Sequence, residues 1–248
     1  MGVLAAVLYG IHIYLIFISK KNESFSHFSQ TVFFGGSIPP LGTKKIKFKM
    51  KILNLYAGLG GNRKLWGDDY YITAVENDPA TAEFYKSQFP NDQVIVADAH
   101  DFLLKNFKDY DFIWASPPCP THSRLNHMRT RPADYPDMRL YQEIIFLKKW
   151  FSGMYVVENV IPYYQPLIPA KMIDRHLFWA NFEIDYFSPK TKALISSNRS
   201  GEAAYLSEIF GFNVSETKIR DKRKALRNCV HPETDRHILQ CAINNRNF

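Results

Sequence analysis

The sequence predicts an α/β fold built on a mainly parallel sheet. From Lys51 onward, apolar segments of strand length alternate with segments of helical periodicity, which is the pattern of repeated βαβ units. Glycine and polar residues follow the predicted strands directly, at the positions where open α/β sheets bind their ligands. With 248 residues, 46% apolar and 22% charged, the chain can bury the core that such a fold needs.

The expected strands are short and apolar, and most of them end at a turn. They cover 51–56, 71–76, 93–97, 111–115, 154–158 and 176–180. The expected helices follow Gly61 and cover 79–88, 101–107, 139–151, 201–210 and 220–245. The sequence shows no internal repeat and no low-complexity tract, so one main domain is expected.

Residues 1–49 differ from the rest in composition. They hold six lysines and one acid, which accounts for +5 of the net charge of +7. Residues 2–18 form an apolar run that is short for a membrane span of ~20 residues, and the following lysines do not fit a signal peptide. We interpret residues 1–49 as a non-native or disordered extension and Met50 as the functional start. A short membrane anchor at 2–18 is the competing hypothesis.

Cys119 is a candidate nucleophile because it ends Ser116-Pro-Pro-Cys119 directly after the predicted strand 111–115. Glu158 ends the next predicted strand at a spacing that fits one βαβ crossover, so its carboxylate is expected at the same sheet edge as the thiol. A thiol that adds to a ring and an acid that protonates the ring are the groups that activation of a pyrimidine requires. A buried, inert cysteine is the alternative for Cys119 taken alone.

A glycine-rich turn, Tyr56-Ala-Gly-Leu-Gly-Gly61, follows the first predicted strand and allows the backbone to approach a ligand closely. Glu76 ends the second predicted strand, where an acid can accept hydrogen bonds from a ribose. Asp98 ends the third and could orient an adenine or an amino group. The chain lacks the Gly-Lys-Ser or Gly-Lys-Thr of a triphosphate site. A nucleoside cofactor without a polyphosphate is therefore expected.

The ordered motifs of this chain resemble those of the DNA cytosine-5 methyltransferases over about 50–243. The motifs are Asn54–Gly61, Val75–Asn77, Ala97–Asp98, Ser116–Cys119 and Val157–Val160. In that family the cysteine adds to C6 of a flipped cytosine, the motif glutamate contacts N3, and S-adenosylmethionine gives its methyl group to C5. The resemblance implies a Rossmann-like S-adenosylmethionine-dependent methyltransferase fold, with double-stranded DNA as the partner.

The resemblance also implies roles for single residues. Catalytic roles are implied for Cys119, Glu158 and Arg175, of which Arg175 matches the second arginine of an Arg-x-Arg element that has Ile173 at its first position. Cofactor contacts are implied for ten residues: Tyr56, Ala57, Gly58, Leu59, Gly61, Glu76, Asn77, Asp98, Pro118 and Asn228. No metal site is expected, because Cys119, Cys229 and Cys241 are not regularly spaced.

Several positions depart from the family pattern. Pro120 stands where a glutamine usually follows the cysteine. A catalytic core is expected at 50–181, but 182–219 is short for a target-recognition region, so sequence selectivity is not predicted. Residues 220–248 are expected to form a basic helical segment that returns to the cofactor site. Phosphate contacts are expected from 222–227 and from a loop with four basic residues, Arg124, His127, Arg129 and Arg131.

Two other functions remain open on sequence grounds. Amino methylation of adenine or cytosine has a similar Ser-Pro-Pro signature followed by an aromatic residue, and Cys119 occupies that place. A nucleic-acid-binding module that keeps the fold without catalysis is the second. The favoured interpretation is a compact, phage-like, monomeric enzyme in the reducing cytoplasm of a bacterium or a phage-infected cell. The recognition sequence and any restriction partner are not predicted.

Overall fold

The computed structural model describes residues 4–9, 12–17, 49–127, 132, 134–189 and 201–245. The chain divides into two compact units, Met1–Ile46 and Lys47–Phe248. In the first unit, β1 (Leu4–Tyr9) pairs antiparallel with β2 (His12–Phe17). The interpretation of residues 1–49 as a non-native or disordered extension stays a prediction. Among the described residues, no helix has the length and apolarity needed to cross a bilayer.

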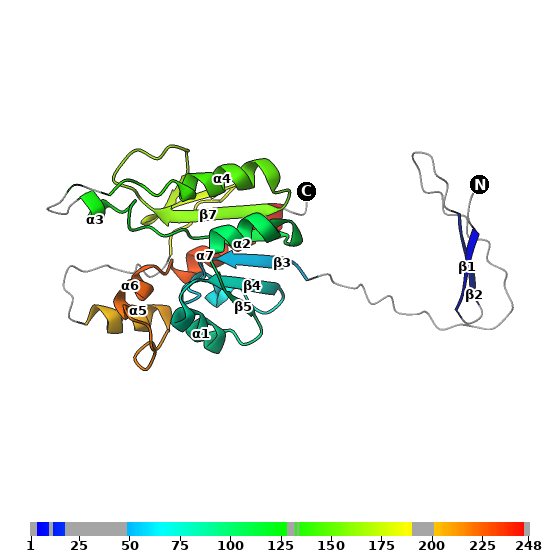
Figure 1. Cartoon of the computed structure of the whole chain (residues 1–248), viewed down its shortest axis with the longest axis horizontal. Coiled ribbons are helices and arrows are strands. Elements are labelled where there is room, and N and C mark those ends of the chain that lie inside the picture. The colour runs from blue at the N-terminus through cyan, green and yellow to red at the C-terminus, as the bar shows by residue number, and fades with distance from the viewer. Residues whose placement is uncertain are drawn as a thin grey trace. The chain divides into compact units, whose positions relative to one another are not determined.

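A seven-stranded sheet forms the centre of the second unit, and its strands lie in the order β5-β4-β3-β6-β7-β9-β8 (Figure 1). The strands are β3 (Lys51–Leu55), β4 (Tyr71–Glu76), β5 (Gln93–Val96), β6 (Phe112–Ala115), β7 (Met154–Val160), β8 (Lys171–Ile173) and β9 (His176–Ala180). The first five pair parallel, and β9 runs antiparallel to both β7 and β8. The expected α/β fold with a mainly parallel sheet is confirmed.

One strand of the sheet was not expected from the sequence. β8 has only three residues, and two of them are exposed, so it leaves no periodic signal. It pairs with β9 through a tight turn in which Asp174 has a left-handed backbone with φ 53°. Aspartate tolerates this conformation better than most residues because its short side chain bonds locally.

The helical segments lie between the strands and near the C-terminus. The α-helices are α1 (Pro79–Gln88), α2 (Ala99–Asn106), α3 (Arg124–His127), α4 (Arg139–Trp150), α5 (Glu202–Phe210), α6 (Lys222–Arg227) and α7 (Pro232–Asn245), and the 3-10 turns are η1 (Asn62–Leu65) and η2 (Phe107–Asp109). The expected helix 220–245 is two helices, because Pro232 lacks a backbone N–H and starts α7 as its first residue. The expected helix after Gly61 is only η1.

Two hydrophobic layers enclose the sheet. Leu53 and Leu55 of β3 face α2 and α4, whereas Ile52 faces the layer that contains Trp66 and α7. This alternation is the period of a strand that is buried on both faces. Figure 1 shows α4 beside β7 and α2 beside β3.

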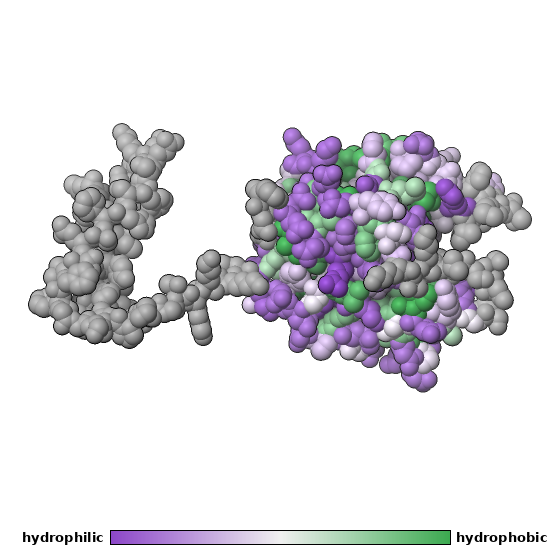
Figure 2. Space-filling view, turned by 180° about the vertical axis from the view of Figure 1, so that it is seen from behind, coloured by the Kyte–Doolittle hydropathy of each residue, from purple (hydrophilic) through white to green (hydrophobic). Residues whose placement is uncertain are grey.

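Hydrophilic residues predominate on the face of the molecule that Figure 2 shows, and hydrophobic residues occur there in small separate areas. The large apolar side chains of the described residues lie mostly in the core, where Trp114 and Phe178 are almost completely buried. Most of the large apolar side chains of the described residues are therefore buried in the core around the sheet.

The connection direction reverses between β3 and β6, which are neighbours in the sheet although β4 and β5 follow β3 in the chain. In open parallel sheets, such a reversal opens a crevice at the carboxyl ends of the two strands. The segment after β3 is the glycine turn 56–61, and the segment after β6 contains Cys119. The fold therefore brings both predicted motifs to the same crevice.

Candidate active site

The glycine loop, residues 56–61, has an unusual backbone. Tyr56, Gly58 and Gly60 have φ angles of 56°, 54° and 82°. At Gly60, a Cβ atom would lie 2.3 Å from the Phe89 ring, so no larger residue fits without a shift of this ring. The Gly58 N–H donates to Glu76 Oε2 at 2.9 Å, which joins the loop to the end of β4. The loop is thus compact and fixed in its shape.

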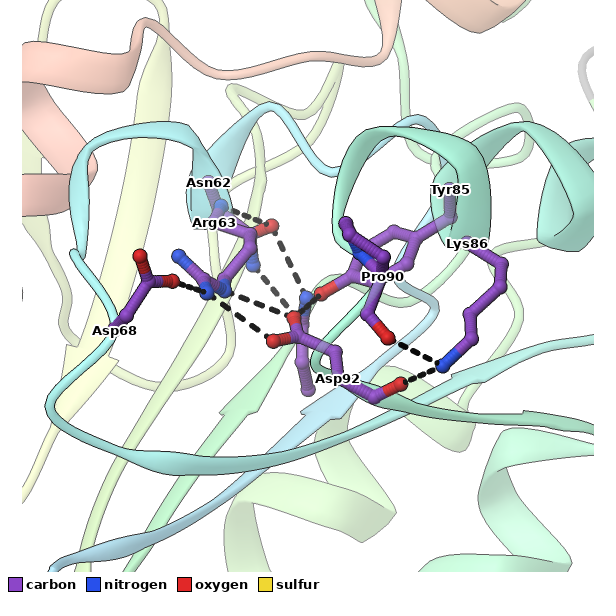
Figure 3. Close-up of polar contacts among 8 residues, drawn as sticks. Asn62, Arg63, Asp68, Tyr85, Lys86, Pro90 and Asp92 are labelled. Carbon is purple, nitrogen blue, oxygen red and sulfur yellow. Dashed lines mark hydrogen bonds and ion pairs between the residues drawn. The ribbon is translucent and has the colours of Figure 1, made fainter.

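A buried polar cluster closes the two ends of this loop (Figure 3). The side chains of Asn54, before the loop, and Asn62, after it, exchange hydrogen bonds of 3.2 and 2.6 Å. Arg63 binds Asp92 through two hydrogen bonds of 2.8 and 3.1 Å, and Tyr85 donates to the same carboxylate at 2.9 Å. Burial opposes the charge of Arg63, but the bonds to Asp92 raise its pKa above the ordinary value. The loop is therefore anchored to the turn before β5.

A pocket opens at the crevice between β3 and β6. Five of the ten predicted cofactor residues line it, namely Tyr56, Glu76, Asn77, Asp98 and Pro118. Six further lining residues were not predicted, namely Ala99, Pro117, His122, Asp137, Arg139 and Leu140. Ala99 and Pro117 are next to predicted residues in the chain, so the sequence motifs could have indicated that they line the pocket. The start of α4 gave no such signal, because its approach to β3 is a long-range contact.

The other predicted cofactor residues lie outside the lining of this pocket. Ala57 and Leu59 are buried in the hydrophobic core. At Gly61, a Cβ atom would lie 2.8 Å from Cys229 Cβ, so close packing of the C-terminal segment explains this glycine. Gly58 bonds Glu76, and Asn228 is an exposed residue at the end of α6. A contact of these residues with a cofactor stays a prediction.

The three predicted catalytic residues interact electrostatically. Burial raises the pKa of Glu158 in β7 to about 7, although a hydrogen bond from Ser116 and the charge of Arg175 lower it. Burial also raises the pKa of the Cys119 thiol, and the negative charge of Glu158 raises it further, whereas Lys224 and Arg175 lower it. The thiol and the carboxyl group therefore lie close enough to influence each other's protonation.

Arg175 is held by the C-terminal segment. Its Nη2 donates to the backbone carbonyls of Arg227 and Cys229, both at 3.1 Å. Burial lowers the pKa of Arg175, and the charge of Glu158 raises it. The C-terminal segment thus contacts Arg175 through these two carbonyl groups, and its expected return to the cofactor site stays a prediction.

The loop that carries Cys119 is fixed by backbone contacts. The N–H groups of His122 and Ser123 donate to the Cys119 carbonyl at 3.0 and 2.9 Å. Asn159 of β7, which was not predicted as a site residue, donates to the Pro117 carbonyl at 2.9 Å. Pro117 and Pro118 have no backbone N–H, so their backbone can form hydrogen bonds only through carbonyl groups. The bond from Asn159 therefore connects this segment to the strand that holds Glu158.

His176 lies beside Glu158 without forming an ion pair. Its Nε2 is 3.7 Å from Glu158 Oε1, which is too long for a hydrogen bond. Burial lowers the pKa of His176 well below its ordinary value, so the ring is neutral at physiological pH. Arg175 is therefore the positive group that acts on Glu158.

The comparisons with known proteins agree with the sequence motifs. Residues 50–161 match the family model described as C-5 cytosine-specific DNA methylase. The resemblance to the DNA cytosine-5 methyltransferases is thereby confirmed over the residues that include the glycine loop, Cys119 and Glu158. This part of the chain, with its mainly parallel sheet, is therefore similar to a methyltransferase. No curated protein matches the chain.

Several solved structures are similar to part of the chain. A putative methyltransferase yhhF from Escherichia coli has 18% identity, covers 53% of this chain and 74% of its own, and has a TM-score of 0.36. A DNMT2 mutant from Spodoptera frugiperda has 26% identity, covers 45% and 36%, and has a TM-score of 0.34. A putative DNA modification methyltransferase encoded within an E. coli prophage has 22% identity, covers 47% and 34%, and has a TM-score of 0.32.

Within the described part of the chain, no cluster of His, Cys, Asp or Glu residues could hold a metal ion. Asp98, one of the acids that line the pocket, instead contacts the N-terminus of α2 and Arg139. Asp98 caps α2 by accepting the N–H of Asp101 at 2.9 Å, and its second oxygen lies 3.6 Å from Arg139 Nη1. The groups that the site offers are therefore a thiol, carboxyl groups and two arginines.

The buried cluster leads to a stability prediction. Asp92→Ala leaves the charge of Arg63 buried without its main partner, so we expect the free energy of unfolding to fall by ~3–5 kcal/mol. Asp68→Ala is the matched control, because Asp68 binds the same guanidinium at 3.1 Å from a side chain that is 78% exposed. We expect it to lower the free energy by less than ~1 kcal/mol. Urea denaturation measures both, and equal effects would contradict the assigned role of Asp92.

Proposed function

We propose that the chain is an S-adenosylmethionine-dependent DNA cytosine-5 methyltransferase. The observation that carries this proposal is that Cys119, in the loop after β6, and Glu158, in the neighbouring strand β7, interact electrostatically beside the pocket that Pro117 and Pro118 line. A nucleophile and an acid at one crevice form the arrangement that addition to a pyrimidine ring requires. The family match covers both residues.

The pocket residues fit an adenosyl group. Tyr56, Pro118 and Leu140 provide apolar walls for a flat base. Glu76 is held at the end of β4 by the N–H groups of Gly58 and Asp78, at 2.9 and 3.0 Å, so its carboxylate is fixed in place to accept ribose hydroxyls. S-adenosylmethionine supplies the methyl group when it is bound. We therefore assign the pocket to this cofactor.

The residues divide the reaction between them. The Cys119 thiolate adds to C6 of an extruded cytosine and forms an S–C6 bond, while the Glu158 carboxyl group gives its proton to N3. C5 becomes nucleophilic and takes the methyl group. The C5 proton then passes to solvent water, and the electron pair of the C5–H bond forms the C5–C6 double bond as the S–C6 bond breaks, which restores the aromatic ring and the thiolate. Glu158 recovers its proton from N3.

The shifted pKa values suit these roles. A carboxyl group with a pKa of about 7 keeps a proton in much of the population at neutral pH, which an ordinary glutamate does not. When Glu158 is protonated, its negative charge no longer opposes the Cys119 thiolate, whose pKa that charge raises. Protonation of the acid and ionisation of the thiol therefore favour each other.

Basic residues near the thiol support DNA as the substrate. Lys224 is exposed on α6, and its charge lowers the pKa of Cys119, so it lies near the reacting sulfur. Arg223 and Arg227 pair with the buried Glu202, at 3.4 and 2.8 Å, and hold α6 on α5. Arg124 is exposed on α3, whereas the side chain of His127 and residues 129 and 131 lie outside the described residues. Lys224 and Arg124 would contact phosphates without reading bases.

The recognition region and cellular setting belong to the same proposal. Parts of 182–219 form α5 and a small hydrophobic cluster with Leu206 and Phe210, and 190–200 lie outside the described residues. We assign limited DNA recognition to this region.

Cys119, Cys229 and Cys241 are free cysteines. Because the reaction requires a reduced thiol, we expect the enzyme in a reducing, cytoplasmic compartment. That it is a monomer stays a prediction.

A trapping experiment tests the nucleophile. Double-stranded DNA that contains 5-fluorocytosine should form a stable covalent complex with the full chain and S-adenosylmethionine, because fluorine blocks loss of the C5 proton. We expect no complex with Cys119→Ala and an undiminished complex with Cys241→Ala, a buried cysteine in α7. Denaturing gel electrophoresis resolves the complex, and a complex formed by Cys119→Ala would refute the assignment.

The pH dependence of kcat/KM tests the acid. The reactive state of the pair holds one proton, on Glu158 and not on Cys119. At low pH both groups are protonated, and at high pH neither is. The value of kcat/KM should therefore rise as pH increases through about 7 and fall above the raised thiol pKa. In Glu158→Gln the limb near pH 7 should be absent, and the rate should be lower by ~100-fold or more. A limb near pH 7 that persists in this variant would assign it to another group.

A further inference from the structure

Glu143 is a carboxylate of α4 whose side chain is 0% exposed. It does not line the pocket, but its neighbours along α4, Arg139 and Leu140, do. Burying an ionisable group costs free energy unless its partners compensate for the loss of water. The contacts of Glu143 show which parts of the site it joins.

Two pocket elements meet at one oxygen of Glu143. The Tyr56 hydroxyl donates a short hydrogen bond to Oε1, and His100 Nδ1 lies 2.9 Å from the same oxygen. Because a carboxylate oxygen accepts, the His100 proton is on Nδ1 in this contact. Tyr56 belongs to the glycine loop, and His100 follows two pocket residues, Asp98 and Ala99. Glu143 therefore joins three walls of the pocket, from the glycine loop, α2 and α4.

The electrostatics of this contact favour a fixed arrangement. Burial raises the pKa of Tyr56 far above its ordinary value, so its hydroxyl remains a donor throughout the physiological range. Burial also raises the pKa of Glu143, and the bonds from Tyr56 and His100 lower it. Oε2 of Glu143 has no hydrogen-bond partner within the described residues. The carboxylate is thus held by Oε1 alone, through Tyr56 and His100.

Tyr56 needs such support because of its backbone. Its φ of 56° is a left-handed conformation that costs free energy in a residue with a side chain. Its ring lines the pocket, so the bond at its hydroxyl fixes both the ring and the first residue of the glycine loop. A tyrosine without this acceptor would have a buried donor without a partner.

We propose that Glu143 is a positioning residue of the cofactor pocket, which acts through Tyr56 and His100 and holds three pocket walls in the geometry that binds the adenosyl group. This inference rests on the proposed function. Glu143 contacts no ligand, so its loss should weaken binding and leave the chemical step little changed. A role in folding alone would lower the stability and leave the affinity of the folded protein unchanged.

Calorimetric titration of the full chain with S-adenosylhomocysteine tests this inference. Glu143→Leu removes the acceptor, and we expect Kd to rise about tenfold or more, because two donors near the ligand lose their partner. Glu143→Gln keeps an acceptor oxygen at the same position and should restore Kd to within about threefold of the wild type. Glu83→Leu, on the exposed face of α1, is the matched control and should leave Kd unchanged.

Tyr56→Phe separates positioning from folding. This variant removes one hydroxyl group and should raise Kd about threefold. In the Glu143→Leu background it should add nothing, because both substitutions remove the same contact. At saturating S-adenosylmethionine, kcat should stay within about twofold of the wild type in the Glu143 variants that fold. Thermal unfolding identifies the variants that fold.

The outcomes separate the two levels of the proposal. If the wild type binds S-adenosylhomocysteine and Glu143→Leu binds it equally well, the inference is overturned and the proposed function stands. Additive effects of Tyr56→Phe and Glu143→Leu would also overturn it. If Glu143→Leu does not fold, an unchanged Kd in Tyr56→Phe overturns it instead. No binding by the wild type would overturn the proposed function together with the inference.

Discussion

The closure of the glycine loop by buried polar contacts is the constraint on which the site depends. Three of its residues have a left-handed backbone, which an isolated chain would not hold. The Asn54–Asn62 exchange joins its two ends, and Arg63 and Asp92 fix it to the turn before β5. Such a cluster is stabilising only when every member has its partners, because an unpaired buried group costs more than the pair gains. The loop, the pocket and the position of Tyr56 all follow from it.

Burial of acids has a second consequence at the reaction centre. Removing Glu158 from water raises its pKa, and the same absence of water strengthens the influence of Arg175 on Glu158 and of Glu158 on Cys119. Glu143 is buried as well, but its two donors keep one oxygen occupied. Two glutamates in similar burial thus have different tasks. In the proposed mechanism, Glu158 holds a transferable proton, whereas Glu143 accepts hydrogen bonds that fix the pocket.

The sequence predicted the parts of the fold that local periodicity determines. The bounds of β4, β9 and α1 agree with it, and Pro232 shows why one expected helix is two. The pairing of Cys119 with Glu158 followed from strand ends in a parallel sheet. Glu143 and Asn159 could not be found in this way, because their partners are 87 and 42 residues away in the chain. Close packing of Gly61 on Cys229 could not be predicted either, because the two residues are far apart in the chain.

The identity of the methylated base tests the central claim most directly. Double-stranded DNA incubated with the full chain and S-adenosylmethionine that has a labelled methyl group would be digested to nucleosides and separated. The proposed roles of Cys119 and Glu158 predict that the label appears in 5-methylcytosine and disappears in Cys119→Ala. Label in N4-methylcytosine or N6-methyladenine, or unchanged labelling without the thiol, would contradict the proposed mechanism.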